Sequence, residues 1–153
     1  MTGYDVRLAA FDELDARTAY LLWQLRESVF VVEQQCAYPE LDGLDLDPGT
    51  RHVWVESDGA PASYLRVLSL TGPGGTRIGR VLVAKPWRGR GLAEVVVRAA
   101  LEAIGDRPSS LDSQSYLAHW YTRFGYERAG PEFLEDGIPH VPMRREGPPQ
   151  RRA

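Results

Sequence analysis

The spacing of apolar residues changes several times along this chain and predicts a series of short elements. Residues 4–9 alternate weakly between polar and apolar positions, which predicts a first strand. From Asp15, a residue type that often caps helices, apolar side chains recur at helical spacing and predict an amphipathic helix to about Val29. Residues 29–32 break that period, and residues 36–50 are dense in turn formers, so we expect an acidic loop there.

The middle of the chain has the pattern of a β-meander. Residues 52–56 and 63–70 are rich in strand-forming residues, and Asp58-Gly59 between them is a strong hairpin signal. A glycine-rich turn at 72–75 leads into a third run over 76–84. We therefore predict three consecutive antiparallel strands.

The strongest helical pattern follows this meander. An apolar face and an opposite charge ladder are expected along one helix that ends at Gly105. The apolar face comprises Leu92, Val95, Val96, Ala99 and Ala103, and the ladder comprises Glu94, Arg98 and Glu102. Later segments predict a strand over 110–113, a helix over 116–124, and strands over 127–133 and 140–144.

Together these elements predict an α/β fold of order β-α-β-β-β-α-β-α-β-β, with room for a short extra helix before the meander. Both parallel and antiparallel neighbours are expected, in a mixed, mostly antiparallel central sheet flanked by helices. The 153 residues have the size of one domain, which we place at residues 1–146, followed by a flexible tail over 147–153.

Composition narrows the function classes. A net charge of −3 argues against a general nucleic-acid binder, which usually carries excess positive charge. The chain has one cysteine, Cys36, so it has no internal disulfide and no cysteine-cluster metal site, and we expect an inert cysteine in a reducing compartment. No segment has the length and apolarity of a signal peptide or a membrane span. The expectation is a cytoplasmic protein without a metal or a membrane partner.

Residues 81–93 carry the clearest chemistry. An apolar strand leads through a turn into a loop with Gly89 and Gly91, which opens directly into the strongest helix. Glycines let backbone N–H groups approach a ligand, and a helix start carries about half a positive charge, so this is the pattern of an anion site. Arg88 and Arg90 add donors suited to phosphate oxygens. A plain tight turn with solvated arginines is the alternative for this segment.

Other phosphate-binding loops fit less well. A dinucleotide fingerprint would need a third glycine at position 94, which is Glu94. A Walker-type loop needs lysine followed by serine or threonine, whereas Lys85 is followed by Pro86.

Two short motifs resemble one family. Arg88-x-x-Gly91-x-Ala93, after the strand 81–83, is similar to the acetyl-coenzyme A signature of the GCN5-related N-acetyltransferase (GNAT) family. Residues 120–126, Trp-Tyr-Thr-Arg-Phe-Gly-Tyr, are similar to an aromatic element that follows in that family at the same distance. Further blocks at 29–34, 38–43, 45–52 and 135–140 resemble its ElaA-like branch, so the resemblance spans about residues 6–145.

This resemblance implies acetyl-coenzyme A as the cofactor and a set of residues that would bind it. The pantetheine arm would lie along β-strand backbone, and the pyrophosphate would lie on the glycine loop. The implied binding residues are Val81, Leu82 and Val83 for the arm, Arg88, Gly89, Arg90, Gly91, Leu92 and Ala93 for the pyrophosphate, and Gln114 across the arm.

The resemblance also implies catalytic residues. Tyr121 occupies the position whose hydroxyl protonates or hydrogen-bonds the departing thiolate. An amine nucleophile must lose a proton, so a base is required, and Glu33 is the first candidate, with His140 and His52 as second choices. A packed aromatic for Tyr121 and a surface carboxylate for Glu33 are the competing structural interpretations.

Charge is distributed unevenly along the chain. Residues 33–50 hold five acids and no base, whereas residues 76–90 hold five bases and no acid. We predict a basic segment suited to a phosphorylated cofactor and an acidic one suited to a cationic amine. Glu40, Asp42 and His140 are therefore the expected acceptor-binding residues.

Three functions remain open on these observations. The first is acetyl transfer to an amine of a small molecule or peptide by direct attack in a ternary complex. The second is a non-catalytic acyl-coenzyme A module, which would not need the hydroxyl of Tyr121. The third is an anion-binding interaction protein. The family resemblance also makes a homodimer one expected assembly.

Overall fold

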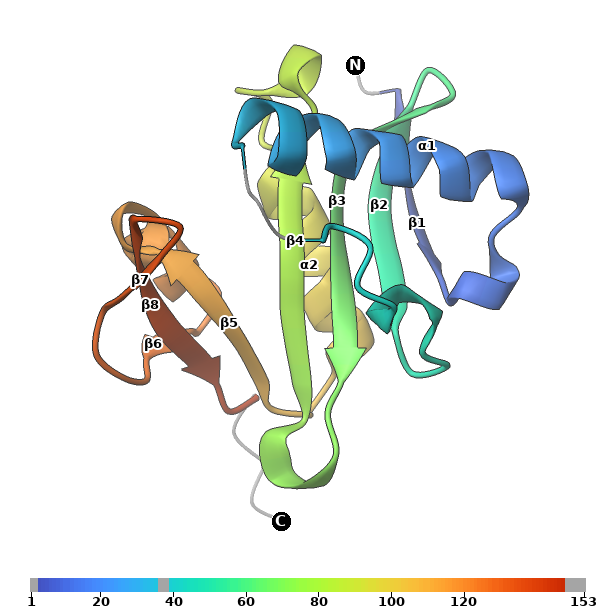
Figure 1. Cartoon of the computed structure of the whole chain (residues 1–153). Helices are drawn as coiled ribbons and strands as arrows, with labels where there is room; N and C mark the ends of the chain where they lie inside the picture. The colour runs from blue at the N-terminus through green and yellow to red at the C-terminus, as the bar shows by residue number, and fades with distance from the viewer. Residues whose placement is uncertain (1–2, 36–38, 148–153) are drawn as a thin grey trace.

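The computed structural model describes residues 3–35 and 39–147 and shows one eight-stranded sheet with helices on both faces (Figure 1). The strands run in the order β1-β2-β3-β4-β5-β8-β6, and β7 pairs with β8 off this path. Only the β4–β5 pair is parallel, so the predicted mixed, mostly antiparallel α/β sheet is confirmed. The strands are β1 Tyr4–Ala9, β2 Arg51–Ser57, β3 Ala60–Ser69, β4 Thr76–Val83, β5 Ser109–Gln114, β6 Glu127–Arg128, β7 Phe133–Glu135 and β8 Ile138–Arg145.

Helices α1 and α2 lie on opposite faces of the sheet (Figure 1). The α-helices are α1 Ala16–Arg26, α2 Leu92–Ile104 and α3 Ala118–Thr122. After α1 the chain continues as a π-helix, η2 Glu27–Glu33, which is the form taken by the break in helical period near Val29. Short 3-10 turns cover Phe11–Glu13, Leu44–Leu46, Gly72–Gly74, Lys85–Trp87 and Ser115–Leu117.

Local sequence signals explain how these elements begin and turn. The Asp15 carboxylate accepts a hydrogen bond of 2.7 Å from the Thr18 N–H, so it caps α1 as expected. Asp58 and Gly59 both have positive φ, +52° and +76°, and form the tight turn between β2 and β3. The predicted meander is therefore confirmed.

Each face of the sheet has its own apolar core. On one face, Leu22 of α1 packs against Trp54 and Tyr64. On the other, Val96 and Val97 of α2 pack against strand residues that alternate with those two. This alternation explains why β2 and β3, in the middle of the sheet, are buried on both sides.

The sheet divides at its parallel joint. Strands β4 and β5 pair only at Thr76–Ser109 and Arg77–Ser110. Beyond these residues β5 leans away from β4 (Figure 1). The diverging strands leave the upper edge of β4 without a strand neighbour and open the space that holds the candidate site.

Several predicted element details were wrong. The buried face of α2 comprises Leu92, Val96, Val97, Ala100 and Ile104. Ala103, predicted to lie on this face, is exposed, because the buried face of α2 is the one that packs on the sheet. The predicted strand 127–133 is two short strands, β6 and β7, and β8 begins two residues before His140 as the second arm of a hairpin.

Some predictions fall on parts of the chain that the structure does not describe. Cys36 and residues 148–153 of the predicted tail lie outside the described residues. Within residues 3–35 and 39–147, no helix has the length and apolarity needed to cross a membrane.

Candidate active site

Two cavities share a wall between the diverging strands. The larger, of about 690 Å³, lies among η2, the end of β4, the 85–91 loop, the start of α2 and α3, and we call it the loop cavity. The smaller, of about 390 Å³, lies among η2, β4, β5 and the β7–β8 hairpin, and we call it the sheet cavity. The residues that line both are Gln34, Val81, Tyr116, Leu117 and Tyr121.

The loop cavity has the geometry of an anion site at a helix start. Gly89 and Gly91 have φ of +80° and +77°, a conformation that favours glycine, and a Cβ at either would meet no atom within 4 Å. The Val95 N–H donates to the Gly91 carbonyl, so the N–H groups of residues 92–94 precede the first helical hydrogen bond. These open, unpaired donors fit a pyrophosphate.

Most residues predicted to bind the cofactor line this cavity. Val81, Leu82, Val83, Arg88, Gly89, Gly91, Leu92 and Ala93 all contribute to its wall. Arg90 does not, because its guanidinium lies 4.8 Å over the ring centre of Trp87. Gln114 lines the sheet cavity instead, where it pairs with His140 across β5 and β8.

Arg88 is held by Glu33 across the mouth of the loop cavity. The two Nη atoms donate to the carboxylate at 2.6 and 2.8 Å, and Nε donates to the Val83 carbonyl at 3.1 Å. The hydrogen bonds from Arg88 lower the pKa of Glu33. A carboxylate with a lowered pKa is a weaker base, so this position does not favour Glu33 as the proton acceptor.

Tyr121 stands where the two cavities meet. Its side chain is 7% exposed, and burial raises its pKa to about 12. The ring packs edge-on against Trp120 and Tyr126, but no described residue forms a hydrogen bond with its hydroxyl. The phenol therefore stays protonated at neutral pH and has a free hydrogen to donate.

His140 lies in the sheet cavity with one ring nitrogen available. Its Nδ1 is 2.8 Å from the Ile138 carbonyl, which can only accept, so Nδ1 carries the hydrogen and the neutral ring has a bare Nε2. Nε2 is 3.7 Å from a carboxylate oxygen of Glu135, and the ring stacks on Phe133. These contacts fix the ring and place a negative charge beside Nε2.

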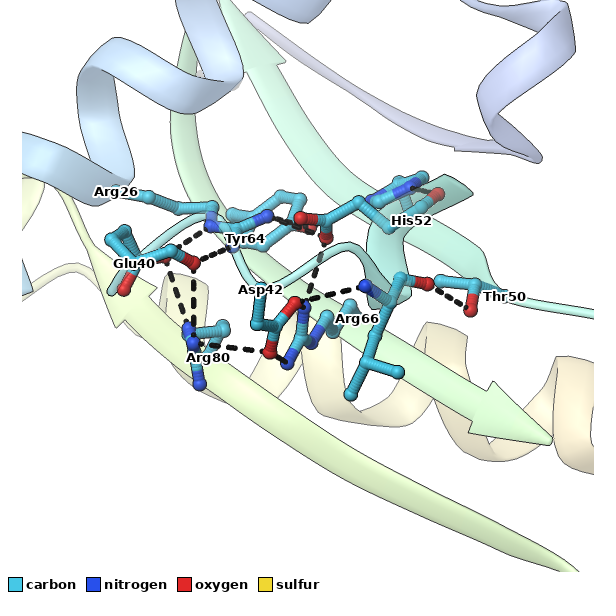
Figure 2. A network of polar contacts seen from close by, with 10 residues as sticks. Arg26, Glu40, Asp42, Thr50, His52, Tyr64, Arg66 and Arg80 are labelled. Atoms are coloured by element: carbon cyan, nitrogen blue, oxygen red, sulfur yellow. Dashed lines mark hydrogen bonds and ion pairs between the residues drawn. The ribbon is translucent and has the colours of Figure 1, made fainter. Parts of the chain in front are cut away.

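The acidic segment forms a structural ion network (Figure 2). Arg26 is fully buried and donates to Glu40 at 2.5 Å and to Asp45 at 2.7 Å. Arg80 donates to the same Glu40 carboxylate oxygen at 3.0 Å. One carboxylate thus links the end of α1 to β4.

A second arginine completes the network. Arg66 donates to both carboxylate oxygens of Asp42, at 2.9 and 2.6 Å, and to Asp45 at 3.1 Å (Figure 2). The hydrogen bonds from Arg66 lower the pKa of Asp42 to about 2. His52 and Tyr64 lie behind this network, and their 2.7 Å hydrogen bond is buried.

These contacts change the expected picture of charge. Glu40 lines the sheet cavity, but its carboxylate and that of Asp42 are already bound by arginines, and Asp42 is not part of the wall. Most of the basic segment pairs with acids too, including Arg77 with Asp112. The acids of residues 33–50 pair mainly with Arg26 and Arg66, and two bases of residues 76–90, Arg80 and Arg88, pair with acids of that segment. Most of the charge expected to face a cofactor or an amine is thus already engaged in ion pairs. His52 is buried away from both cavities.

One further residue at the site, Arg80, is not predictable from the sequence. Arg80 has φ of +57°, and the β3–β4 register shifts beside it, with Tyr64 opposite Leu82 but Arg66 opposite Gly79. This bulge turns the β4 backbone next to Val81, at the wall between the cavities. A positive φ at a residue other than glycine has no recognisable pattern in a single sequence.

No metal centre accompanies these residues in the part of the chain that the structure describes. No group of three or more His, Cys, Asp or Glu side chains there could hold a metal ion. What the site offers is a polar loop for an anion, a buried phenol and an imidazole in adjoining cavities.

Comparison with known proteins identifies the class to which this fold and site belong. The sequence profile of the acetyltransferase (GNAT) domain matches residues 23–146. The structure is similar to the crystal structure of an acyl-CoA N-acyltransferase from Pseudomonas aeruginosa, with a TM-score of 0.88 and 39% identity, covering 93% of this chain and 99% of that one. The protein is therefore a member of the GNAT family of acyltransferases.

Particular relatives place it within the ElaA-like branch. Escherichia coli ElaA is 36% identical over 139 residues, covering 88% of this chain and 91% of ElaA. The ElaA crystal structure has a TM-score of 0.89 to this one and covers 94% of this chain and 99% of that one. A UPF0039 protein of Mycobacterium tuberculosis is 49% identical over 138 residues, covering 88% of each chain.

Proposed function

We propose that this protein transfers an acetyl group from acetyl-coenzyme A to an amine of a small molecule or peptide, by direct attack in a ternary complex. The observation that carries the proposal is the position of Tyr121, which lines both the loop cavity and the sheet cavity and whose hydroxyl forms no hydrogen bond with a described residue. Acyl donor and amine entering from the two cavities would meet beside it.

The loop cavity supports coenzyme A as the donor. Backbone N–H groups at the start of α2 and the open positions of Gly89 and Gly91 suit the pyrophosphate. No described strand pairs with the outer edge of β4 at Val81–Val83, although the Val83 carbonyl accepts a hydrogen bond from Arg88. This edge suits the amide groups of the pantetheine arm, in the manner of an added strand. Val81 lines both cavities, so an arm running along this edge reaches Tyr121.

The acetyl thioester supplies an activated acyl group: a C–N bond forms to the amine, the C–S bond breaks, and the thiolate departs. The Tyr121 hydroxyl donates a hydrogen bond to the sulfur. With a phenol pKa of about 12 against about 8.5 for an ordinary thiol, full proton transfer is favourable only if burial also raises the thiol pKa. Stabilising the thiolate by a hydrogen bond is therefore the main task of this residue.

The amine proton goes to His140 in this proposal. The ammonium form of an ordinary amine has a pKa near 10, so the substrate must lose a proton before it can attack. His140, whose Nε2 is the nitrogen without a hydrogen in the neutral ring, lines the sheet cavity. Glu135 beside Nε2 stabilises the imidazolium that forms. Glu33, the first candidate from sequence, anchors Arg88 instead.

The first experiment measures thiol release from acetyl-coenzyme A with a panel of amines. Turnover with at least one amine is expected, and calorimetry should show tighter binding of acetyl-coenzyme A than of ADP or phosphate. Tight binding without turnover on any amine would favour the non-catalytic module. Equal binding of acetyl-coenzyme A and phosphate would exclude both the acetyltransferase and the non-catalytic acyl-coenzyme A module.

A second experiment separates the two candidate bases. His140→Gln should lower kcat by about 10²-fold and leave the Kd for acetyl-coenzyme A unchanged. Glu33→Gln should leave kcat nearly unchanged, because the carboxylate is not the proton acceptor in this proposal. The opposite pattern would return the role to Glu33.

A further inference from the structure

The edge strand β1 presents an apolar row on one side and opposite charges on the other. Tyr4, Val6 and Leu8 are 41%, 45% and 46% exposed and point to one face of the sheet. Asp5 and Arg7 point to the other, with side chains that are 72% and 52% exposed. Residues 4–8 are apolar, acidic, apolar, basic and apolar in order. About Val6 the hydropathy pattern is therefore symmetric, whereas the charge changes sign.

This strand is also unpaired along its outer edge. β1 is the last strand of the sheet, so only one of its edges is hydrogen-bonded to a described strand. Natural edge strands are often protected by proline, lysine or other charged side chains. Residues 4–9 contain neither proline nor lysine, and their two charges, Asp5 and Arg7, are opposite in sign. The apolar row continues that of Val53 and Val55, which α2 covers, but α2 packs on β2, β3 and β4 and leaves β1 open.

We propose that two copies of this chain pair through β1 in an antiparallel, two-fold symmetric dimer centred on Val6. In that register Tyr4 lies opposite Leu8 of the second copy, and Val6 lies opposite its own equivalent. Asp5 lies opposite Arg7 of the second copy, and this pair occurs twice. The apolar row is buried on one face while both charge pairs form on the other.

The charges select this register. A shift of two residues in one direction sets Asp5 opposite Asp5 of the second copy, and a shift in the other direction sets Arg7 opposite Arg7. Like charges directly opposite each other are unfavourable, so the pairing centred on Val6 is the one that the strand accepts. A different protein would have no reason to match this internal symmetry, which is why a second copy is the occupant.

The dimer joins two sheets edge to edge at the end far from the catalytic cavities. The cavities lie between β4 and the β5–β8 half, whereas β1 is at the opposite end of the strand order. Each copy therefore keeps a complete site, and turnover per chain does not depend on assembly. The test of the dimer is thus independent of the proposed acetyl transfer.

Sedimentation analysis over a dilution series tests the proposal. The wild-type chain should be dimeric at high concentration and should dissociate on dilution, because a single strand pair is a small interface. Arg7→Asp and Asp5→Arg should each weaken the dimer by about tenfold or more, since each sets like charges opposite each other twice. The double variant D5R/R7D should recover the dimer, because the opposite charges are restored in exchanged places.

The two single variants also separate dimer formation from folding. Within one chain Arg7 is 3.6 Å from both Asp5 and Glu56, and Asp5 lies opposite Glu56. D5R loses the pair with Arg7 but gains an opposite charge across from Glu56, whereas R7D loses both pairs and gathers three acids. R7D should therefore lower thermal stability more than D5R does, but both should disrupt the dimer. A wild-type monomer at every concentration, or a D5R/R7D chain that stays monomeric, would overturn the proposal.

Discussion

The carboxylate of Glu33 holds both Nη atoms of Arg88, at 2.6 and 2.8 Å, and so ties η2 to the loop before α2. The two residues are 55 positions apart and belong to opposite walls of the loop cavity. An anion that binds at the start of α2 meets an arginine whose Nη donors are already engaged. This competition determines the first prediction.

Replacing Glu33 by glutamine should tighten coenzyme A binding. The variant weakens the contact that occupies Arg88, so a phosphate gains a freer partner, and we expect the Kd measured by calorimetry to fall by about two- to fivefold. Glu146→Gln, which removes a similar exposed pair with Arg144, is the control and should change nothing. Weaker cofactor binding in E33Q would show instead that Glu33 holds Arg88 in its binding position.

Tyr121→Phe should impair turnover and leave the cofactor affinity unchanged. No described residue forms a hydrogen bond with the hydroxyl, so its loss should cost little stability, but the departing thiolate loses a donor. We expect kcat to fall by about 10²-fold with an unaltered Kd for acetyl-coenzyme A. Because a phenol with a pKa of about 12 stays protonated, the wild-type rate should not decline through Tyr121 below about pH 11. Unaltered turnover in the variant at all pH values would remove Tyr121 from the mechanism.

Arg26→Met should strongly destabilise the fold. Arg26 is fully buried, and its removal leaves Asp45 and Glu40, themselves largely buried, with one fewer cationic partner each. Breaking a buried pair from one side costs about 3–5 kcal/mol, which urea unfolding would measure. Arg98→Met removes an exposed pair with Glu94 and should cost under about 1 kcal/mol. Equal losses in the two variants would contradict this account.

Asp42 should contribute to loss of stability in acid. Its pKa is lowered to about 2 in the folded protein from an ordinary value of 3.8, so its contribution is complete above about pH 4 and is lost as the pH falls toward 2. Asp42→Asn should therefore be less stable than the wild type at neutral pH by about 1 kcal/mol, allowing for its partial exposure. The two unfolding free energies should converge near pH 2. A difference that stays constant with pH would exclude the ion pair with Arg66 as its source.

Gly75→Ala should damage the joint between β4 and β5. A Cβ at Gly75 would lie 2.3 Å from the Pro108 carbonyl oxygen, and φ there is +75°. We expect a loss of about 3 kcal/mol or more in the free energy of unfolding, since strain and overlap add. Gly59→Ala has nearly the same φ, +76°, but open space around it, so it isolates the strain alone and should cost about 1 kcal/mol. Similar losses in both would show that Pro108 yields to the new methyl group.

Local signals made most of the fold predictable from the sequence. Asp58-Gly59 and the Asp15 cap of α1 act on residues close to them in the chain, so one sequence is enough to recognise them. A second such signal, Asp136-Gly137, has φ values of +52° and +74° and forms the β7–β8 hairpin. It was missed because the flanking strands are short and mostly exposed.

The site was only partly predictable for a different reason. The glycine loop and Tyr121 belong to compact motifs, whereas the partners of Glu40 lie 14 and 40 positions away, at Arg26 and Arg80. Charge counted along the chain indicates how many acids and bases are present but not which ones face each other. The fold therefore decides that Glu40 and Asp42 bind arginines.

Because β4 and β5 pair at only two positions, the sheet consists of two parts connected by a short contact. Antiparallel hydrogen bonds connect β1, β2, β3 and β4 into one part, and β5, β6, β7 and β8 into the other. If these two parts move relative to each other, the space beside Tyr121 widens or narrows, and the backbone must bend at residues 75–77 and 108–110, where β4 and β5 meet. The width of the space beside Tyr121 thus depends on a short backbone contact at the other end of β4.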